Sequence, residues 1–502
     1  MHLPRRQFIH LLSATAVWAM IGRRSRAADA PAAAPIRPAV KLRNPCVAIQ
    51  LGGVSLVDEG IEPVLDFLRD KARVNTIWFN TYTWDHGTGG RQIEGFPFPD
   101  HGVQVYDNDF VGGAVFDYDR RYFERTILSE FRSPDYQGRN LLAELLPKAR
   151  ERGLDVVAWD FFYPNDFNPK KLKHLDRVVE IDVHGRPTWA PCNNNPDWRQ
   201  HMYGRVEVYL RQYPGLAGIA WGQERMGPLM NLIGGGWTQP FVSCFCLHCL
   251  HKAEERNLSV DRAREGFLAL EKLLAAAHAS ERPVDGYFVT FWRLLSQYPE
   301  ILAWEKLWTD SYHETRADVY RIAKSIAPEK PLGFHILHQA TLSPFYRAEE
   351  DYAQTAAYAD FVKPAMYNVA GGERMASFLD RISGTIFHDA KPEDVLPFYY
   401  KIMNYDEAAF AELPRAGLSA GYVARETRRV LDAVQGRIAV YPGIDVGVPG
   451  RGKQVTPQDV RASVQAVFAA GAPGIVLSRK YSEMKLANLA AAGDALREAG
   501  LV

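Results

Sequence analysis

The sequence lacks several features that would identify a partner or a fold at once. Its 59 Lys and Arg residues balance its 59 Asp and Glu residues, so no net charge favours nucleic acid or an anionic membrane. Beyond the N-terminal region no stretch reaches 18 uninterrupted apolar residues, so we expect no stable membrane insertion. No repeat of fixed period is present. No glycine-rich phosphate fingerprint follows the first expected strand, which disfavours a doubly wound dinucleotide-binding sheet.

The N-terminus has the pattern of an export signal. A basic start is followed by an apolar stretch and then by small residues, with Arg5-Arg6-Gln7-Phe8-Ile9 resembling the twin-arginine motif. An ordinary secretory signal with two chance arginines is the alternative. We predict a signal peptide over 1–30, cleaved near Ala27 to Ala30, and an Ala/Pro-rich linker over 31–40. The mature protein is then expected to be soluble and periplasmic or secreted.

Short apolar runs alternate with helical patterns from residue 45 onward, which predicts a parallel sheet built from βα units. Eight such units predict an α/β fold, a (β/α)8 TIM barrel over residues 41–502. Enlarged loops are expected from Trp84 to Glu130 and at 227–310, the latter a zinc-binding and helical insertion after strand four. The expected strands span 45–53, 74–82, 154–162, 216–224, 332–338, 359–367, 437–445 and 473–481.

Three of the five cysteines lie within six residues, at Cys244, Cys246 and Cys249. This spacing suits thiolate coordination of a tetrahedral metal, and a closed thiolate site would be structural. Cys192 is the best fourth ligand, with His248 and His251 in reserve. A disulfide with free thiols is the alternative for an exported chain. We predict a structural zinc and expect the fifth thiol, Cys46, to be buried in strand one.

Cys192, Asn194, Pro196 and Arg199, followed by a helix, a strand ending on Glu224 and the Cys-x-Cys-x-x-Cys motif, resemble family 42 glycoside hydrolases. The resemblance covers about residues 190 to 250 and the surrounding barrel pattern. It implies that the four cysteines bind zinc beside the active site and that Glu224 is the acid/base. The chain departs from the family at two positions: Gln223 stands where the family has Asn, and strand seven ends on Asp445 where the family has Glu. The C-terminal 474–498 resembles uncharacterised bacterial proteins described as glycoside hydrolases.

Hydrolysis of a glycosidic bond usually needs two carboxyl groups that flank the bond. Glu224 and Asp445 end different strands, so we predict them as the catalytic pair. Asp445 is one methylene shorter than Glu, and nucleophile, base acting through water and sugar-binding group all stay open for it. Asp160, at the end of strand three, competes with them. Asp85, Asp117 and Asp119 are expected to be capping or solvated loop carboxylates.

Other polar and aromatic residues lie at strand ends, where barrel enzymes bind substrate. The resemblance also suggests that Tyr367 contacts the nucleophile, and Lys363 requires a partner because its flanking residues are apolar. The expected substrate-binding residues are Asp160, Arg225, His335, His338, Lys363, Tyr367, Arg479 and Trp221.

These observations predict an exported glycoside hydrolase that cleaves an oligosaccharide or glycoside by a two-carboxylate mechanism. A metal-dependent sugar isomerase or lyase is the second reading, with His335, His338 and Asp160 or Asp445 at its metal. A non-catalytic carbohydrate-binding barrel is the third. In each case the expected partner is a carbohydrate, without nucleic acid, and a homo-oligomer is compatible with the sequence.

Overall fold

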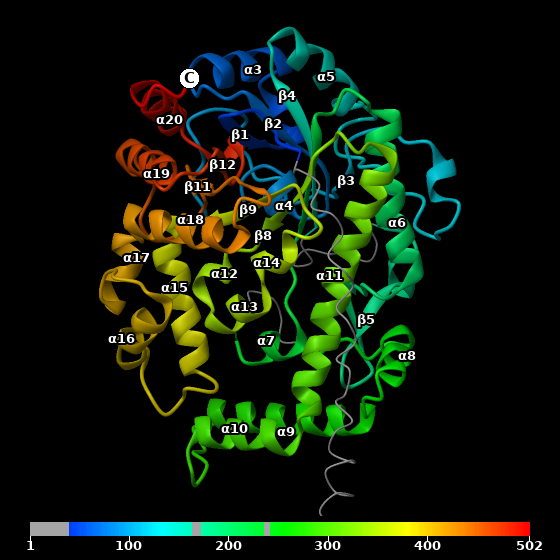
Figure 1. Cartoon of the computed structure of the whole chain (residues 1–502), viewed down its shortest axis with the longest axis vertical. Helices are drawn as coiled ribbons and strands as arrows, with labels where there is room; N and C mark the ends of the chain where they lie inside the picture. Colours follow the sequence, from blue (N-terminus) through cyan, green and yellow to red (C-terminus); the bar gives the residue numbers. More distant parts are fainter. Residues whose placement is uncertain (1–39, 163–171, 235–240) are drawn as a thin grey trace, which may run out of the picture. The chain divides into compact units, whose positions relative to one another are not determined.

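Apolar strands pair side by side to close a parallel barrel surrounded by helices (Figure 1). The computed structural model describes residues 40–162, 172–234 and 241–502. The barrel closes because β1 pairs with both β12 and β2. All eight predicted strand positions are confirmed, and the TIM barrel with them. The barrel strands are β1 (Cys46–Leu51), β2 (Thr76–Thr83), β4 (Asp155–Phe162), β7 (Gly218–Gln223), β8 (Leu332–Ile336), β9 (Phe361–Met366), β10 (Ala439–Val440) with β11 (Gly443–Asp445), and β12 (Gly474–Ser478).

The seventh barrel strand is interrupted, although its sequence reads as one apolar run. The short strands β10 and β11 flank Tyr441 and Pro442. Pro442 has no N–H to donate to a neighbouring strand, so a break in the ladder is expected there. β10 pairs with β9, and β11 pairs with both β9 and β12. The barrel therefore stays closed on both sides of the break.

Amphipathic helices cover the outside of the barrel. In α3, for example, Ile61, Val64, Leu65 and Leu68 are buried at the i, i+3, i+4, i+7 spacing of one helical face. Burial of that face against the sheet is what holds such a helix in place. The main covering helices are α3 (Ile61–Asp70), α5 (Leu141–Glu151), α6 (Pro196–Glu207), α11 (Glu300–Ile326), α15 (Asn368–Ser383), α18 (Ala420–Val434), α19 (Pro457–Ala469) and α20 (Leu486–Glu498).

The predicted insertion after β7 is helical. It contains α7 (Pro228–Leu232), α8 (Leu247–Glu255), α9 (Val260–His278) and α10 (Tyr287–Gln297), and Figure 1 shows α9 and α10 at one end of α11. Helix α11 crosses the predicted boundary at residue 310 and continues to Ile326. Its 27 residues include no Gly or Pro, so no local signal would end the helix earlier.

The loop after β2 also carries short elements, α4 (His86–Gly89) and β3 (Gly113–Ala114). A hairpin that the sequence did not suggest follows β4, formed by β5 (Val179–Ile181) and β6 (Pro187–Pro191). The predicted signal peptide (1–30) and all of the linker (31–40) except its last residue lie outside the described residues and stay predictions. Within the described part of the chain, no helix is long and apolar enough to cross a membrane.

Candidate active site and cysteine cluster

Alternation along β7 directs Glu224 into the mouth of the barrel. Ala220 belongs to the apolar cluster inside the barrel, whereas Ile219 and Trp221 belong to the cluster between barrel and helices. Glu224 has the inward parity, and its backbone N–H donates to Phe162 O of β4 (3.1 Å). At Gly222 an added Cβ would lie 2.6 Å from the Phe161 ring. Glycine at this position therefore leaves room for the aromatic floor next to Glu224.

Glu224 lines a cavity of about 320 Å³ at the C-terminal ends of the strands. This is the face on which barrel enzymes place their active sites. Five residues predicted from the sequence line it together: Glu224, His335, His338, Tyr367 and Arg479. The other lining residues are Gln50, Asp85, Gly87, Thr88, Ile93, Trp159, Phe161, Leu337 and Arg374.

A chain of buried polar side chains leads away from Glu224. Its Oε1 lies 2.7 Å from His335 Nε2, His335 Nδ1 lies 3.3 Å from Lys363 Nζ, and Lys363 donates to the hydroxyl of Tyr367 (2.7 Å). If Lys363 donates to Nδ1, the neutral ring carries its proton on Nε2 and donates to the Glu224 carboxylate. Lys363 itself lies behind the cavity wall and supports His335 and Tyr367.

This chain sets the charges of the site. Burial by itself would raise the pKa of Glu224, but the His335 hydrogen bond and the positive charges of Arg374 and Lys363 outweigh it and lower that pKa below its ordinary value. Burial, aided by the charge of Lys363, lowers the pKa of His335 to about 4. Burial also lowers the pKa of Lys363 to about 7. At neutral pH Glu224 is thus ionised and His335 is neutral.

Two arginines, Arg374 and Arg479, also line the cavity. His338 contacts Arg374 through Nδ1 (3.1 Å) and the Tyr422 hydroxyl through Nε2 (3.1 Å). Arg479 forms a two-pronged ion pair with Glu483 (2.9 Å from Nε). Arg374 was not predicted, because an arginine within a helical pattern reads as a solvated surface residue. Only the tertiary structure shows that α15, which begins directly after β9, brings Arg374 to the cavity.

Four predicted substrate-binding residues do not line the cavity: Lys363, described above, and Asp160, Trp221 and Arg225. Asp160 pairs in register with Trp221, and both lie on the helix side of the sheet. The Asp160 carboxylate accepts hydrogen bonds from Arg205 (2.8 Å) and the Tyr209 hydroxyl (2.8 Å), all fully buried. Asp160 and Trp221 are therefore part of the packing between barrel and helices.

Arg225 also points away from the cavity. It forms an ion pair with Glu180 (2.6 Å) and donates to Pro191 O (3.0 Å). Glu180 in turn accepts a hydrogen bond from the hydroxyl of Ser243 (2.5 Å), the residue before Cys244. Arg225 thus connects the end of β7 to the cysteine segment and does not face the substrate cavity.

Asp445 ends its strand as predicted but does not line the cavity. Its two oxygens accept hydrogen bonds from the backbone N–H groups of Ala370 (2.9 Å) and Val448 (2.9 Å). Ala370 lies in the first turn of α15, where backbone donors have no partner within the helix. Burial raises the pKa of Asp445 to about 6, with the backbone hydrogen bonds opposing that shift. Asp445 thus holds α15 and the following loop, and it is set apart from the site because it does not line the cavity.

The four predicted metal ligands come together. The sulfur atoms of Cys192, Cys244, Cys246 and Cys249 lie within 4.8 Å of one another, and Cys192 Sγ lies 3.5 Å from Cys249 Sγ. All four are free thiols, and 3.5 Å is far longer than a disulfide bond of about 2.05 Å. Four thiolates around zinc at about 2.3 Å would require sulfur separations close to those observed. The cluster could therefore hold a metal ion.

Cys46 lies apart, in β1, as expected. It is fully buried, and burial raises the pKa of its thiol to about 12.

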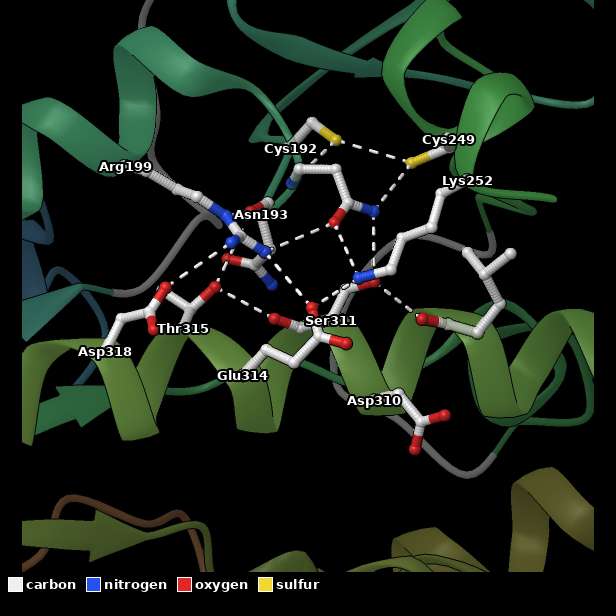
Figure 2. Close-up of polar contacts among 12 residues, drawn as sticks. Cys192, Asn193, Arg199, Cys249, Lys252, Asp310, Ser311, Glu314, Thr315 and Asp318 are labelled. Carbon is white, nitrogen blue, oxygen red and sulfur yellow. Dashed lines mark hydrogen bonds and ion pairs between the residues drawn. The ribbon is translucent and has the colours of Figure 1, made fainter. Parts of the chain in front are cut away.

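The cysteine cluster is tied to α11 and to the end of β7. Figure 2 shows Cys192 and Cys249 above α11, the helix that carries Ser311 and Thr315, with polar side chains between the cysteines and the helix. The Asn194 amide donates to Cys249 Sγ (3.3 Å) and to Ser311 (3.0 Å). Gln223, at which the chain departs from the family pattern, points away from the cavity and donates to Asn193 (3.0 Å). The residues next to Cys192 and to Glu224 are therefore in direct contact.

A second, larger cavity of about 510 Å³ lies between α7, α10, α11 and α13 (Pro344–Glu349). Its walls are mainly apolar, and they include the carboxyl groups of Glu305 and Glu349, the first buried and the second half-buried. It is not at the strand ends and contains none of the predicted site residues. We therefore assign the candidate active site to the Glu224 cavity.

No family model matches the sequence, and no curated protein matches it. Solved structures do match. One is a β-galactosidase from Halorubrum lacusprofundi, with a TM-score of 0.51 and 13% identity, covering 90% of this chain and 58% of that one. Another is a β-galactosidase from Marinomonas ef1, with a TM-score of 0.49 and 12% identity, covering 91% of this chain and 61% of that one. A third is the PgaB glycoside hydrolase domain from Bordetella bronchiseptica, with a TM-score of 0.45 and 11% identity, covering 90% of this chain and 97% of that one. The chain thus spans about three fifths of the two β-galactosidases, and what it shares with the Halorubrum enzyme is the barrel fold.

Proposed function

We propose that the chain is a glycoside hydrolase whose substrate sugar binds in the cavity around Glu224. The observation that carries the proposal is a half-buried glutamate that follows the fourth barrel strand and lines a cavity floored by Trp159 and Phe161. Aromatic faces and a few oriented polar groups are what a sugar site requires. The fold shared with a β-galactosidase supports the same activity class.

Glu224 acts as the acid in this proposal, so it must gain a proton before the bond breaks. The side chains behind it supply a route. Lys363 passes a proton to Nδ1 of His335 while the Nε2 proton of the same ring moves to Glu224. The pKa of Lys363, about 7, makes its proton available near neutrality. In this proposal Lys363 and His335 are positioning residues that deliver a proton to Glu224, which is ionised in the resting site.

A metal-dependent isomerase or lyase receives less support. Within the described residues, four cysteines form the one group of three or more potential metal ligands that meets the distance limits. His335 and His338 instead contact Glu224, Arg374 and Tyr422. We propose that the cysteines hold a structural zinc, because a site of four thiolates leaves no open position for substrate.

Export by the twin-arginine pathway is part of the same proposal and is supported by the Arg5-Arg6-Gln7-Phe8-Ile9 motif. A folded, metal-loaded chain could cross the membrane by this route.

The function is tested by a screen of 4-nitrophenyl glycosides and plant and bacterial oligosaccharides with the wild type and with Glu224→Gln. We expect hydrolysis by the wild type and a loss of kcat of about 100-fold or more in Glu224→Gln, the usual range for a general acid. Full activity of Glu224→Gln would overturn the assignment. Sugar binding by the wild type without any turnover would favour the non-catalytic barrel.

A further inference from the structure

The proposed hydrolysis requires a second carboxyl group near the bond, and Asp445 does not line the cavity. We propose that Asp85 is this second carboxylate and that it acts as the base that activates water. The inference rests on the proposed function. Of the described residues that line the cavity, Asp85 and Glu224 are the two carboxylic acids.

Asp85 follows β2 and Glu224 follows β7, the second and fourth strands of the barrel. One strand, β4, lies between them and contributes the floor residues Trp159 and Phe161. Neighbouring strands are about 4.8 Å apart, so the two chain segments are separated by roughly 10 Å along the wall. Carboxyl groups carried by segments this far apart would leave room for a water molecule between them, which is the arrangement of inverting hydrolases.

The Asp85 carboxylate is held in a fixed orientation. Its Oδ1 accepts from Gly87 N (3.2 Å), and its Oδ2 accepts from the Thr88 hydroxyl. The side chain is buried in the cavity wall, with a residue exposure of 6%. The negative charge of Asp85 contributes to raising the pKa values of Arg479 and Lys480, so both cations lie within electrostatic reach of it. Lys480 also fixes the loop, because its Nζ donates to Gly90 O (2.6 Å).

The reaction balances with these two groups. Glu224 gives its proton to the glycosidic oxygen as the bond from that oxygen to the anomeric carbon breaks. Asp85 takes a proton from the water whose oxygen forms the new bond to the same carbon. One water is consumed. Asp85 releases its proton to solvent, and Glu224 regains a proton through His335 and Lys363, with solvent as the final source.

The structural alternative is that Asp85 only caps α4, and one substitution separates the two roles. Asparagine is as good an N-cap as aspartate, but it cannot take a proton from water. Asp85→Asn therefore keeps the cap and removes the base. Asp109→Asn is the matched control, because Asp109 lies exposed on the same loop and does not line the Glu224 cavity.

The experiment uses the 4-nitrophenyl glycoside that the wild type hydrolyses. We expect kcat to fall about 100-fold or more in Asp85→Asn, with an unchanged melting temperature and with Asp109→Asn like the wild type. In Asp85→Ala, sodium azide should restore turnover and yield a glycosyl azide, which loss of a cap would not produce. NMR of the first product should show inverted configuration.

Activity of Asp85→Asn within tenfold of the wild type would overturn the inference, as would a retained configuration. Azide rescue of Asp445→Ala in place of Asp85→Ala would also overturn it. These outcomes leave the hydrolase itself intact. A wild type that hydrolyses no glycoside refutes the proposed function instead, so the two failures are distinguishable.

Discussion

His335 Nε2 lies 2.7 Å from Oε1 of Glu224, and the other nitrogen of the same ring faces Lys363 at 3.3 Å. This single ring connects the cavity carboxylate to a buried amine. The hydrogen bond is a main reason why Glu224 is ionised despite its burial. The state of Glu224 therefore depends on side chains from three successive barrel strands.

Removal of the His335 ring should raise the pKa of Glu224. Burial remains in His335→Asn, while the donor that favours the ionised carboxylate is lost. The limb of the profile of kcat/KM against pH that reports Glu224 should move to higher pH. His338→Asn is the control, because His338 lines the cavity but contacts Arg374 and Tyr422. Equal shifts in the two variants would contradict a specific role for His335.

Lys363 should make stability depend on pH. Its pKa is about 7 in the folded chain, against an ordinary value of 10.5. Between these values the unfolded chain binds more protons, so the free energy of unfolding should rise with pH. The burial penalty is present in full below pH 7. Lys363→Met lacks this group, so its free energy of unfolding should rise less.

Urea unfolding at pH 7, 8 and 9 measures this difference. Lys306→Met is the control, since the Lys306 side chain is 75% exposed. Identical pH slopes for the wild type and Lys363→Met would show that Lys363 is not buried as described.

Asp445→Asn should weaken the fold more than the chemistry. An amide can accept at its oxygen but not at its nitrogen, so one of the backbone donors at Ala370 and Val448 loses its partner. An unsatisfied buried donor costs about 1–3 kcal/mol of the free energy of unfolding. Urea titration at pH 7 measures this loss, with exposed Asp432→Asn for comparison. A loss of kcat without any loss of stability would return Asp445 to the catalytic pair.

Cys246→Ser should reduce the zinc content of the purified protein and lower its melting temperature. Loss of the metal should also reduce activity, because Asn193 next to Cys192 supports Gln223 next to Glu224. Elemental analysis and thermal unfolding measure both effects. Cys46→Ala should keep its metal, since Cys46 lies in β1 away from the cluster. Unchanged zinc in Cys246→Ser would contradict the site.

Some of the side-chain placements outside the cavity could have been predicted from the sequence. Once Glu224 is assigned to the inside, a period of two places Trp221 on the outside. The placement of Asp160 could not be predicted in this way, because the face of the sheet on which it lies depends on the register that pairs it with Trp221. Register is a property of two strands and cannot be read from either strand alone.

Other site features depend on packing between distant segments. Arg374 of α15 lines the cavity, and the first turn of the same helix binds the Asp445 carboxylate through the N–H of Ala370. Gly443 leaves the space that the Lys363 amine occupies, since an added Cβ would collide with that side chain. None of these contacts leaves a periodic signal in the sequence.

The sequence by itself determined the barrel, the order of its strands, Glu224 at the end of the fourth strand and the four cysteines that cluster. Each depends on a local pattern of apolar runs or on short spacing, which the chain carries regardless of its partners. Only the tertiary structure decided which carboxylate shares the cavity with Glu224. That choice depends on which hydrogen-bond donors each carboxylate meets, and those donors come from segments brought together only when the barrel closes.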